Sequence, residues 1–237
     1  MPFLALVVNL PLRHPIWQAH SAMDKSAWRH QVLQRRSALP DAGSYAGGQL
    51  ASAPGLVGCL PGMGESVACY LSTGSEPDTA ALLQLLVERG LVVLLPAPGP
   101  TRRAIKWGMV TPATCALPVS PPGGLPQPPP PYLGAKALGQ CQLVLVPALA
   151  VDRSGTRLGR GGGWYDRALA EVAPGALVLA VVYPSEVLPA GALPREAHDV
   201  PVDGVLTSAG AVLFNSPGPP TLMGGQPTWF GTGPFAG

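Results

Sequence analysis

Charged residues are scarce in this chain of 237 residues. Lys, Arg, Asp and Glu make up 12% of it, about half of the roughly 25% found in an average soluble domain. The formal net charge is only +2, and no tract of Lys and Arg occurs in the sequence. Proteins that bind nucleic acid mainly through its phosphates need a strongly basic surface. We therefore expect no nucleic-acid partner.

Two further absences narrow the class of protein. No apolar run reaches the roughly 18 residues of a membrane-spanning helix, so we expect no membrane span. The four cysteines, at positions 59, 69, 115 and 141, show no C-x-x-C spacing, which argues against a structural zinc site. A disulfide framework is unusual at this length, so we interpret the cysteines as reduced thiols of a cytoplasmic protein.

Glycine and proline are abundant, with 30 residues of each, and they divide the chain. The hydrophobic content of 47% supports one sizeable core, and we expect a single domain over residues 23–214. Residues 1–22 have poor flanks for a signal peptide and are predicted to be an extension outside the fold. Residues 112–131 contain nine prolines and predict an irregular loop, while residues 215–237 predict a flexible tail.

Short apolar strands alternate with helices between these segments. A helix is expected from the capping residue Asp24 to a point before Pro40. A strand at 67–71, a helix at 80–89 closed by Gly90, and a strand at 91–95 stopped by Pro96 form a βαβ unit, whose strands are parallel. Further strands are expected at 142–147, 177–182 and 204–207, with a helix from Trp164 to about residue 172. The pattern predicts an α/β fold.

A glycine cluster, GRGGG at residues 159–163, stands between a predicted strand and a helix. Glycines let backbone amides approach a phosphate closely, and the first N–H groups of a helix lack partners. Arg157 and Arg160 add charged donors. The cluster is not a P-loop, since no Gly-Lys-Ser/Thr follows, and not G-x-G-x-x-G, since position 166 is Asp. A flexible loop in a glycine-rich chain is the alternative, and we interpret the cluster as a phosphate site.

Two carboxylates are candidate metal ligands beside that site. Asp166 lies in the first turn of the predicted helix, where a carboxylate suits a metal that bridges phosphate oxygens. A first-turn Asp is also favoured by the helix dipole alone, which is the structural alternative. Asp199 is the second candidate ligand, from another loop at the edge of the sheet.

The segment LVLVPALAVDRSGTRLGRGGGWYDRAL closely resembles the signature of the 5-formyltetrahydrofolate cyclo-ligases, also called methenyltetrahydrofolate synthetases. Three more segments resemble the family in order and spacing: Lys25 and Arg29 in the first helix, residues 70–79, and residues 193–203. The resemblance covers roughly residues 24–207. It implies a three-layer α/β/α sandwich with a mostly parallel sheet, related to ribose-5-phosphate isomerase-like and CoA-transferase-like folds.

The resemblance also implies a reaction and a set of site residues. The family closes 5-formyltetrahydrofolate to 5,10-methenyltetrahydrofolate at the expense of ATP. ATP is expected at Lys25, Arg29, Arg157, Leu158, Gly159, Arg160, Gly161, Gly162, Gly163, Trp164 and Tyr165, with Arg157 and Tyr165 as catalytic residues. Mg²⁺ is expected at Asp166 and Asp199. The folate is expected at Leu71, Glu76, Arg160, Gly161, Gly162, Gly163 and Trp164. We further expect the protein to be cytoplasmic and monomeric.

Two other readings stay open on the sequence. Some relatives of this family have lost the cyclisation and bind folate or nucleotide in a regulatory role. A protein of similar fold that binds ATP or a sugar phosphate and acts on another substrate is the third possibility, because fold alone does not fix function.

Overall fold

A computed structural model describes residues 23–38, 49–98, 105–111, 128 and 130–214. The predictions for residues 1–22, for the tail at 215–237 and for nearly all of the proline-rich segment lie outside these residues. None of the helices in the described ranges is long and apolar enough to cross a membrane. Three of the cysteines, Cys59, Cys69 and Cys141, are buried and form no disulfide among the described residues, and Cys115 lies outside the described ranges.

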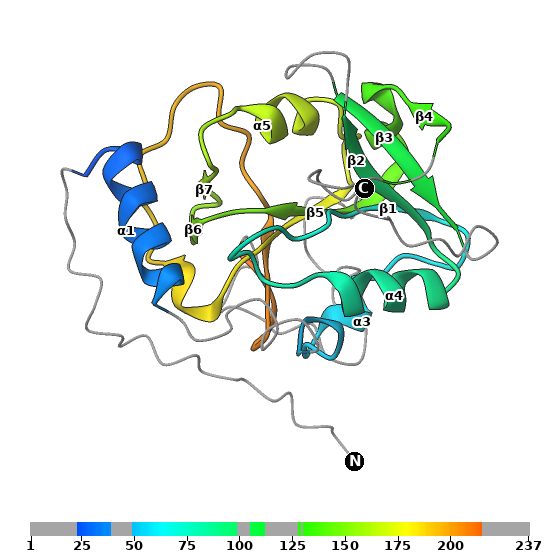
Figure 1. Cartoon of the computed structure of the whole chain (residues 1–237), viewed down its shortest axis with the longest axis horizontal. Helices are drawn as coiled ribbons and strands as arrows, with labels where there is room; N and C mark the ends of the chain where they lie inside the picture. The colour runs from blue at the N-terminus through cyan, green and yellow to red at the C-terminus, as the bar shows by residue number, and fades with distance from the viewer. Residues whose placement is uncertain (1–22, 39–48, 99–104, 112–127, 129, 215–237) are drawn as a thin grey trace.

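A central sheet of eight strands runs through the molecule in the order β11-β10-β8-β5-β1-β2-β3-β4 (Figure 1). Its strands are β1 (Ser66–Ala68), β2 (Val92–Pro98), β3 (Ile105–Val110), β4 (Tyr132–Leu133), β5 (Cys141–Pro147), β8 (Leu177–Val181), β10 (Gly204–Thr207) and β11 (Gly210–Leu213). The inner neighbours β10-β8-β5-β1-β2 are all parallel, whereas β11, β3 and β4 pair antiparallel at the two edges. The predicted mostly parallel sheet is confirmed.

Helices cover both faces of this sheet (Figure 1). On one face lie α3 (Leu56–Cys59) and α4 (Ala80–Glu88), and on the other lie α5 (Trp164–Leu169) and the short helix η1 (Ala135–Gln140). The alternation of β5 explains the two layers: Leu143 and Leu145 pack with the α4 side, while Val144 and Val146 pack with α5 and η1. A strand that is buried on both faces has a continuous run of apolar residues, as residues 143–147 show. The three-layer α/β/α arrangement is therefore the one predicted.

A smaller sheet and the first helix stand at one end of the molecule. The sheet has the order β7-β6-β9, with β6 (Ala150–Asp152), β7 (Arg157–Leu158) and β9 (Val187–Leu188), and η2 (Pro184–Glu186) precedes β9. Helix α1 (Lys25–Ser37) begins after Asp24, whose side chain accepts a hydrogen bond from the Ala27 amide, as predicted. Trp28 and Val32 of α1 pack against Leu149, Ala150, Leu158 and Leu188.

Several predicted boundaries were wrong. β2 continues through Pro96, which pairs with Trp107 of β3. The pairing of β2 with β1 ends at Leu94, so β2 has one neighbour at that point and a proline is tolerated there. α5 ends at Leu169 rather than near residue 172, and β1 ends at Ala68. Strand β3 was not predicted, because Lys106 and Gly108 interrupt its apolar pattern.

Candidate active site

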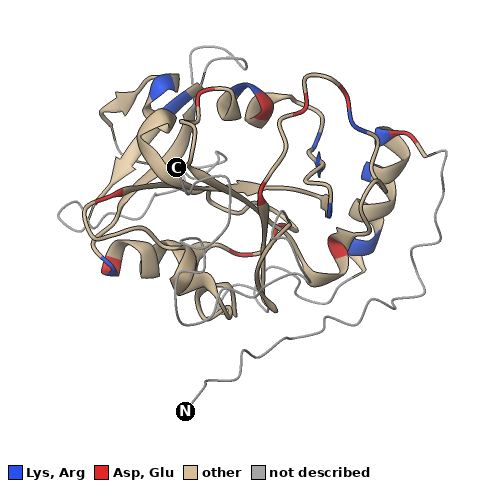
Figure 2. Cartoon of the chain, turned by 180° about the vertical axis from the view of Figure 1, so that it is seen from behind, with Lys and Arg blue, Asp and Glu red and all other residues tan. Residues whose placement is uncertain are grey.

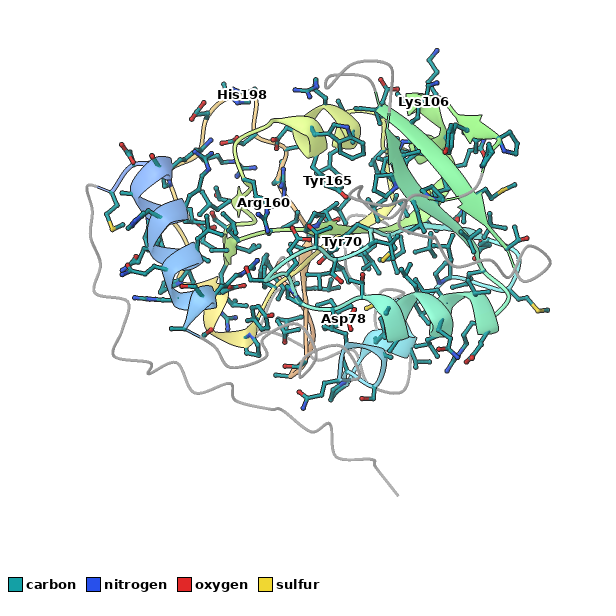
Figure 3. The ribbon with its side chains drawn as sticks, viewed as in Figure 1. Tyr70, Asp78, Lys106, Arg160, Tyr165 and His198 are labelled. Atoms are coloured by element: carbon teal, nitrogen blue, oxygen red, sulfur yellow. The ribbon has the colours of Figure 1, made fainter. Side chains whose placement is uncertain are left out.

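A cavity of about 440 Å³ lies at the carboxyl end of β5, where α1, the glycine loop, the start of α5 and two loops meet. It is lined by Lys25, Arg29, Glu76, Pro147, Ala148, Leu149, Arg157, Gly159, Arg160, Gly161, Gly162, Gly163, Trp164, Tyr165, Asp166, Glu196, His198 and Asp199. Ligands of open α/β sheets bind outside the carboxyl ends of the strands, so the cavity lies at the expected edge. In Figure 3, Arg160 lies between α1 and α5, and Tyr165 lies under α5, on the side of the central sheet.

Most of the predicted site residues meet in this cavity, although 174 positions separate Lys25 from Asp199. Two of them do not line it. Leu158 is 1% exposed and packs under α1, and Leu71 packs against the core on the α4 side. The sequence analysis did not predict that Pro147, Ala148 and Leu149 line the cavity, although they follow a predicted strand whose carboxyl end could have indicated them. It also did not name Glu196 and His198, which lie in the segment 193–199 that resembles the family.

The glycine loop is shaped by backbone conformations that favour glycine. Gly161 has φ +98° and Gly163 has φ +59°, a region that other residues rarely adopt. A Cβ on Gly161 would lie 3.4 Å from Cζ of Arg29, whereas a Cβ on Gly162 would meet nothing within 4 Å. Arg29 Nε donates to the Gly159 carbonyl at 2.9 Å, which ties α1 to the loop.

Arg157 and Asp166 close the two ends of this loop. Arg157 Nη2 donates to Asp166 Oδ1 at 2.7 Å, and the Arg157 side chain is only 4% exposed. Arg157 Nη1 also reaches the carbonyl of Pro147 at 3.5 Å. The guanidinium lies 5.9 Å from the ring centroid of Tyr165. Its Nε is buried and finds no acceptor among the described residues, so this cation keeps an unused donor.

Lys25 is held by two carboxylates at the opposite wall. Its Nζ lies 2.7 Å from Asp199 Oδ2 and 3.0 Å from Glu196 Oε1. Burial alone would raise the pKa of Asp199, but the hydrogen bonds from Lys25 and from the Glu196 amide, together with the nearby positive charge of Lys25, outweigh it, and the pKa is lowered. Burial lowers the pKa of Lys25, and the bonds to Asp199 and Glu196 reverse this, so it ends above its usual value. Both groups are therefore charged near neutral pH.

Glu76 and Arg160 connect the cavity to the loop after β1. Glu76 Oε1 accepts from Arg160 Nε at 3.2 Å, and Glu76 Oε2 accepts from the Thr73 amide at 2.9 Å. The second hydrogen bond stabilises the turn at residues 73–76, so Glu76 both holds this loop and faces the cavity. Arg160 is half exposed, so the contact between the two side chains is easily broken by a ligand.

Two aromatic residues, Trp164 and Tyr165, line the cavity, and Trp107 packs behind Trp164. Trp164 lies 4.7 Å from Tyr165 and 5.5 Å from Trp107, between ring centroids. Trp107 belongs to β3, the strand that was not predicted, and no sequence signal identified it. Burial raises the pKa of Tyr165 far above its usual value, with smaller contributions from Cys69 and Glu76, so its hydroxyl stays protonated. A flat apolar ring system would fit beside such a surface.

Residues of both charges line the cavity, and Figure 2 shows basic positions on α1 and both signs on α5, the two helices beside it. Four cations line it, Lys25, Arg29, Arg157 and Arg160, and four carboxylates, Glu76, Asp166, Glu196 and Asp199. No group of three or more His, Cys, Asp or Glu side chains that suits a metal ion occurs in the described part of the chain. The predicted ligands Asp166 and Asp199 both line the cavity, and each is paired with a cation there.

The sequence of this chain matches one known protein family. The sequence model of the 5-formyltetrahydrofolate cyclo-ligase family matches residues 21–208. A 5-formyltetrahydrofolate cyclo-ligase of Mycolicibacterium smegmatis is 42% identical over 191 residues, which are 79% of this chain and 95% of that protein. A mitochondrial 5-formyltetrahydrofolate cyclo-ligase of Arabidopsis thaliana is 38% identical over 78 residues, which are 30% of this chain and 28% of that protein.

Solved structures show the same fold. The 5,10-methenyltetrahydrofolate synthetase of Aquifex aeolicus superposes with a TM-score of 0.63 at 24% identity, covering 83% of this chain and 96% of that one. The synthetase of Mycoplasma pneumoniae gives 0.57 at 20% identity, covering 78% and 99%. With the family match over most of its length, this chain belongs to the 5-formyltetrahydrofolate cyclo-ligase family, enzymes that convert 5-formyltetrahydrofolate to 5,10-methenyltetrahydrofolate.

Proposed function

We propose that this protein closes 5-formyltetrahydrofolate to 5,10-methenyltetrahydrofolate in a reaction that consumes ATP, requires Mg²⁺ and passes through a phosphorylated formyl oxygen. The observation that carries the proposal is that Lys25 and Arg29 of α1 and Arg157 of β7 line one cavity together with the glycine loop. A cytoplasmic location and a monomeric state are part of the same proposal.

The polyphosphate of ATP fits the cationic side of the cavity. Lys25, Arg29 and Arg157 supply charged donors, and the loop at 159–163 lets backbone amides approach phosphate oxygens without a Cβ in the way. The unused Nε of Arg157 is consistent with a ligand that accepts a hydrogen bond. Leu158 would contribute through its backbone only, because its side chain is buried under α1.

The carboxylates of the cavity fit a magnesium ion that arrives with ATP. A bare triphosphate would meet four carboxylates, and those carboxylates need a cationic partner if Lys25 and Arg157 turn to the phosphates. Mg²⁺ bound with nucleotides typically takes one or two protein carboxylates besides phosphate oxygens and water. Asp166 and Asp199 are the residues that would hold it. When bound, the ion neutralises charge on the phosphoryl group being transferred.

The folate fits the aromatic and acidic side. Trp164 and Tyr165 offer flat faces to the pterin, and Glu76 is placed to accept from its N–H groups once Arg160 turns away. Leu71 would act by packing under the Glu76 loop, since it does not line the cavity. Tyr165 keeps its proton, because burial raises its pKa, and so donates a hydrogen bond toward the formyl or phosphoryl oxygen.

The chemistry needs positioning and charge neutralisation more than a protein nucleophile. The formyl oxygen attacks the γ-phosphorus of ATP, and ADP leaves. N10 then attacks the formyl carbon, the N10 proton is lost, and the C–O bond breaks to release inorganic phosphate. Arg157, which is buried and held by Asp166, stabilises the negative charge that develops on the transferred group.

Omission assays test this proposal. Purified protein with 5-formyltetrahydrofolate should produce the absorbance of the methenyl product only when ATP and Mg²⁺ are both present. Product without ATP would contradict the proposed reaction. Tight folate binding with no turnover under any condition would instead assign the chain to the regulatory members of the family.

A further inference from the structure

Arg36, in the last turn of α1, is buried and is not explained by the proposed chemistry. Only 2% of the residue is exposed, whereas Arg is almost never buried unless it is paired. A cation in the last turn of a helix is favoured by the dipole, but that role needs no burial. The partners of Arg36 must therefore account for its position.

Its contacts fix three donors in a rigid geometry. Nε and Nη2 bind the two carboxylate oxygens of Glu186 at 2.6 and 2.7 Å, and Nη2 also donates to the Ala148 carbonyl at 2.8 Å. The guanidinium lies 5.3 Å from the ring centroid of Tyr183. Glu186 accepts in turn from the Tyr183 amide at 2.9 Å. The whole arrangement is shielded from water, so its charges interact strongly and its geometry is closely defined.

One of these partners belongs to the cavity wall. Ala148 lines the cavity directly after β5. The adjacent Pro147 carbonyl receives Arg157, so two buried guanidiniums hold neighbouring carbonyls at the end of the central strand. Arg36 thus joins α1 to the backbone on which the cavity is built.

The spacing of α1 connects Arg36 to the ATP side. Lys25, Arg29 and Arg36 are separated by four and seven residues, which places them on one face of a helix within about 40° of each other. Arg36 lies about 16 Å along the helix from Lys25. Each of the three contacts the body of the protein: Asp199, Gly159 and Ala148 respectively. A helix anchored at its far end cannot slide or rotate without moving both cations at its near end.

We propose that Arg36 is a positioning residue that sets the register of α1 on the sheet and thereby aims Lys25 and Arg29 at the polyphosphate. The inference rests on the proposed function. Loss of the anchor should weaken binding of ATP and leave binding of the folate nearly unchanged, because Glu76 and the aromatic rings do not belong to α1. A residue with only a structural role would not produce this split.

The test measures the Kd of a non-hydrolysable ATP analogue with Mg²⁺, and separately the Kd of 5-formyltetrahydrofolate, by calorimetry on the full chain. Arg36→Met alone leaves the Glu186 carboxylate buried without its partner and should lower the melting temperature. The double variant Arg36→Met/Glu186→Gln removes both charges and keeps an acceptor for the Tyr183 amide. We expect it to regain most of the melting temperature, to bind the analogue about tenfold more weakly, and to bind the folate within twofold of wild type.

Two further variants sharpen the result. Arg36→Lys keeps the charge without the planar fork, and we expect it to fold and still bind the analogue at least about fivefold more weakly. Arg35→Met removes a half-buried cation from the same helical turn, and it should leave both Kd values unchanged. If Arg36→Lys or the double variant bound the analogue as tightly as wild type, the inference about Arg36 would be wrong, but the proposed function would stand. A wild-type protein that binds no analogue would overturn both the inference and the proposed function.

Discussion

The 2.7 Å contact between Arg157 Nη2 and Asp166 Oδ1 joins strand β7, which leads into the glycine loop, to the first turn of the helix that follows the loop. The loop between them is therefore held at both ends, and the buried guanidinium is held in one orientation. Asp166 is thus more than a first-turn carboxylate that favours the helix dipole. Its loss should affect both stability and catalysis.

Asp166→Asn should lower turnover on the order of a hundredfold or more, because it weakens a magnesium ligand and frees Arg157. It should also lower the free energy of unfolding by about 1–3 kcal/mol, since a buried guanidinium loses its charged partner. Urea denaturation and turnover over a range of Mg²⁺ concentrations measure the two effects. A normal dependence on Mg²⁺ would show that Asp166 acts only through Arg157.

Gly161→Ala and Gly162→Ala form a matched pair. The first substitution places a Cβ at φ +98° and 3.4 Å from the Arg29 guanidinium, so we expect about tenfold weaker ATP binding and a lower melting temperature. The second meets nothing within 4 Å and should change neither quantity appreciably. Equal effects of the two substitutions would show that the shape of the loop around Arg29 is not what binds the nucleotide.

Glu76→Gln should raise the KM for 5-formyltetrahydrofolate by about tenfold and leave the KM for ATP within twofold. The amide keeps an acceptor for the Thr73 amide, so the turn is preserved, but the charge that faces the pterin is lost. Steady-state kinetics with each substrate varied in turn measure the split. A rise in the KM for ATP instead would place Glu76 on the nucleotide side.

The Lys25–Asp199 pair predicts a dependence of stability on pH. The folded pKa of Asp199 is lowered from 3.8, so its contribution is fully present above about 3.8 and is lost as the pH falls through the folded value. The folded pKa of Lys25 is raised above 10.5, so its contribution is lost only above that pH. A double-mutant cycle with Lys25→Met and Asp199→Asn should give a coupling free energy of up to about 1 kcal/mol at pH 7.

The same cycle measured in acid decides whether the charges carry this coupling. It should fall toward zero as the pH drops well below 3.8. A coupling that stayed constant into acid would mean that packing, rather than charge, links the two residues.

The described cysteines should be unreactive in the folded protein. Burial raises the pKa of Cys59 to about 11 and those of Cys69 and Cys141 to about 12, and the thiolate is the reactive form. In a Cys115→Ser variant, Ellman's reagent at pH 8 should label no thiol before denaturation and three after it. Rapid labelling of the native variant would contradict the burial of these side chains.

Sequence patterns predicted the parallel centre of the fold but not its edges. Residues 143–147 and 177–182 are continuous apolar runs, because both faces of those strands are covered. The strands that were not predicted include β3 and the short β4, β6, β7 and β9. Each of them is a strand because it pairs with another segment of the chain, and most of these segments are only two or three residues long. Pro96 continues a strand for the same reason, since only the pairing of β2 shows that one side is open there.

The candidate site divides in a similar way. The glycine loop, Arg157 and Asp166 are close in sequence, so local reasoning indicated an anion site, and the resemblance supplied Lys25, Arg29, Glu76 and Asp199. No pattern indicated that Lys25 meets Asp199 or that Arg36 meets Glu186, because those contacts arise when α1 packs on the small sheet. Trp107 was missed together with β3.

Oxygen transfer tests the central claim most directly. With ¹⁸O in the formyl group of 5-formyltetrahydrofolate, complete turnover by the purified protein with ATP and Mg²⁺ should place one ¹⁸O atom in each inorganic phosphate released, in equal amount to the methenyl product. Mass spectrometry of the phosphate reads this out. Methenyl product accompanied by unlabelled phosphate, with the ¹⁸O found in water, would contradict phosphorylation of the formyl oxygen and with it the proposed role of the cationic cavity.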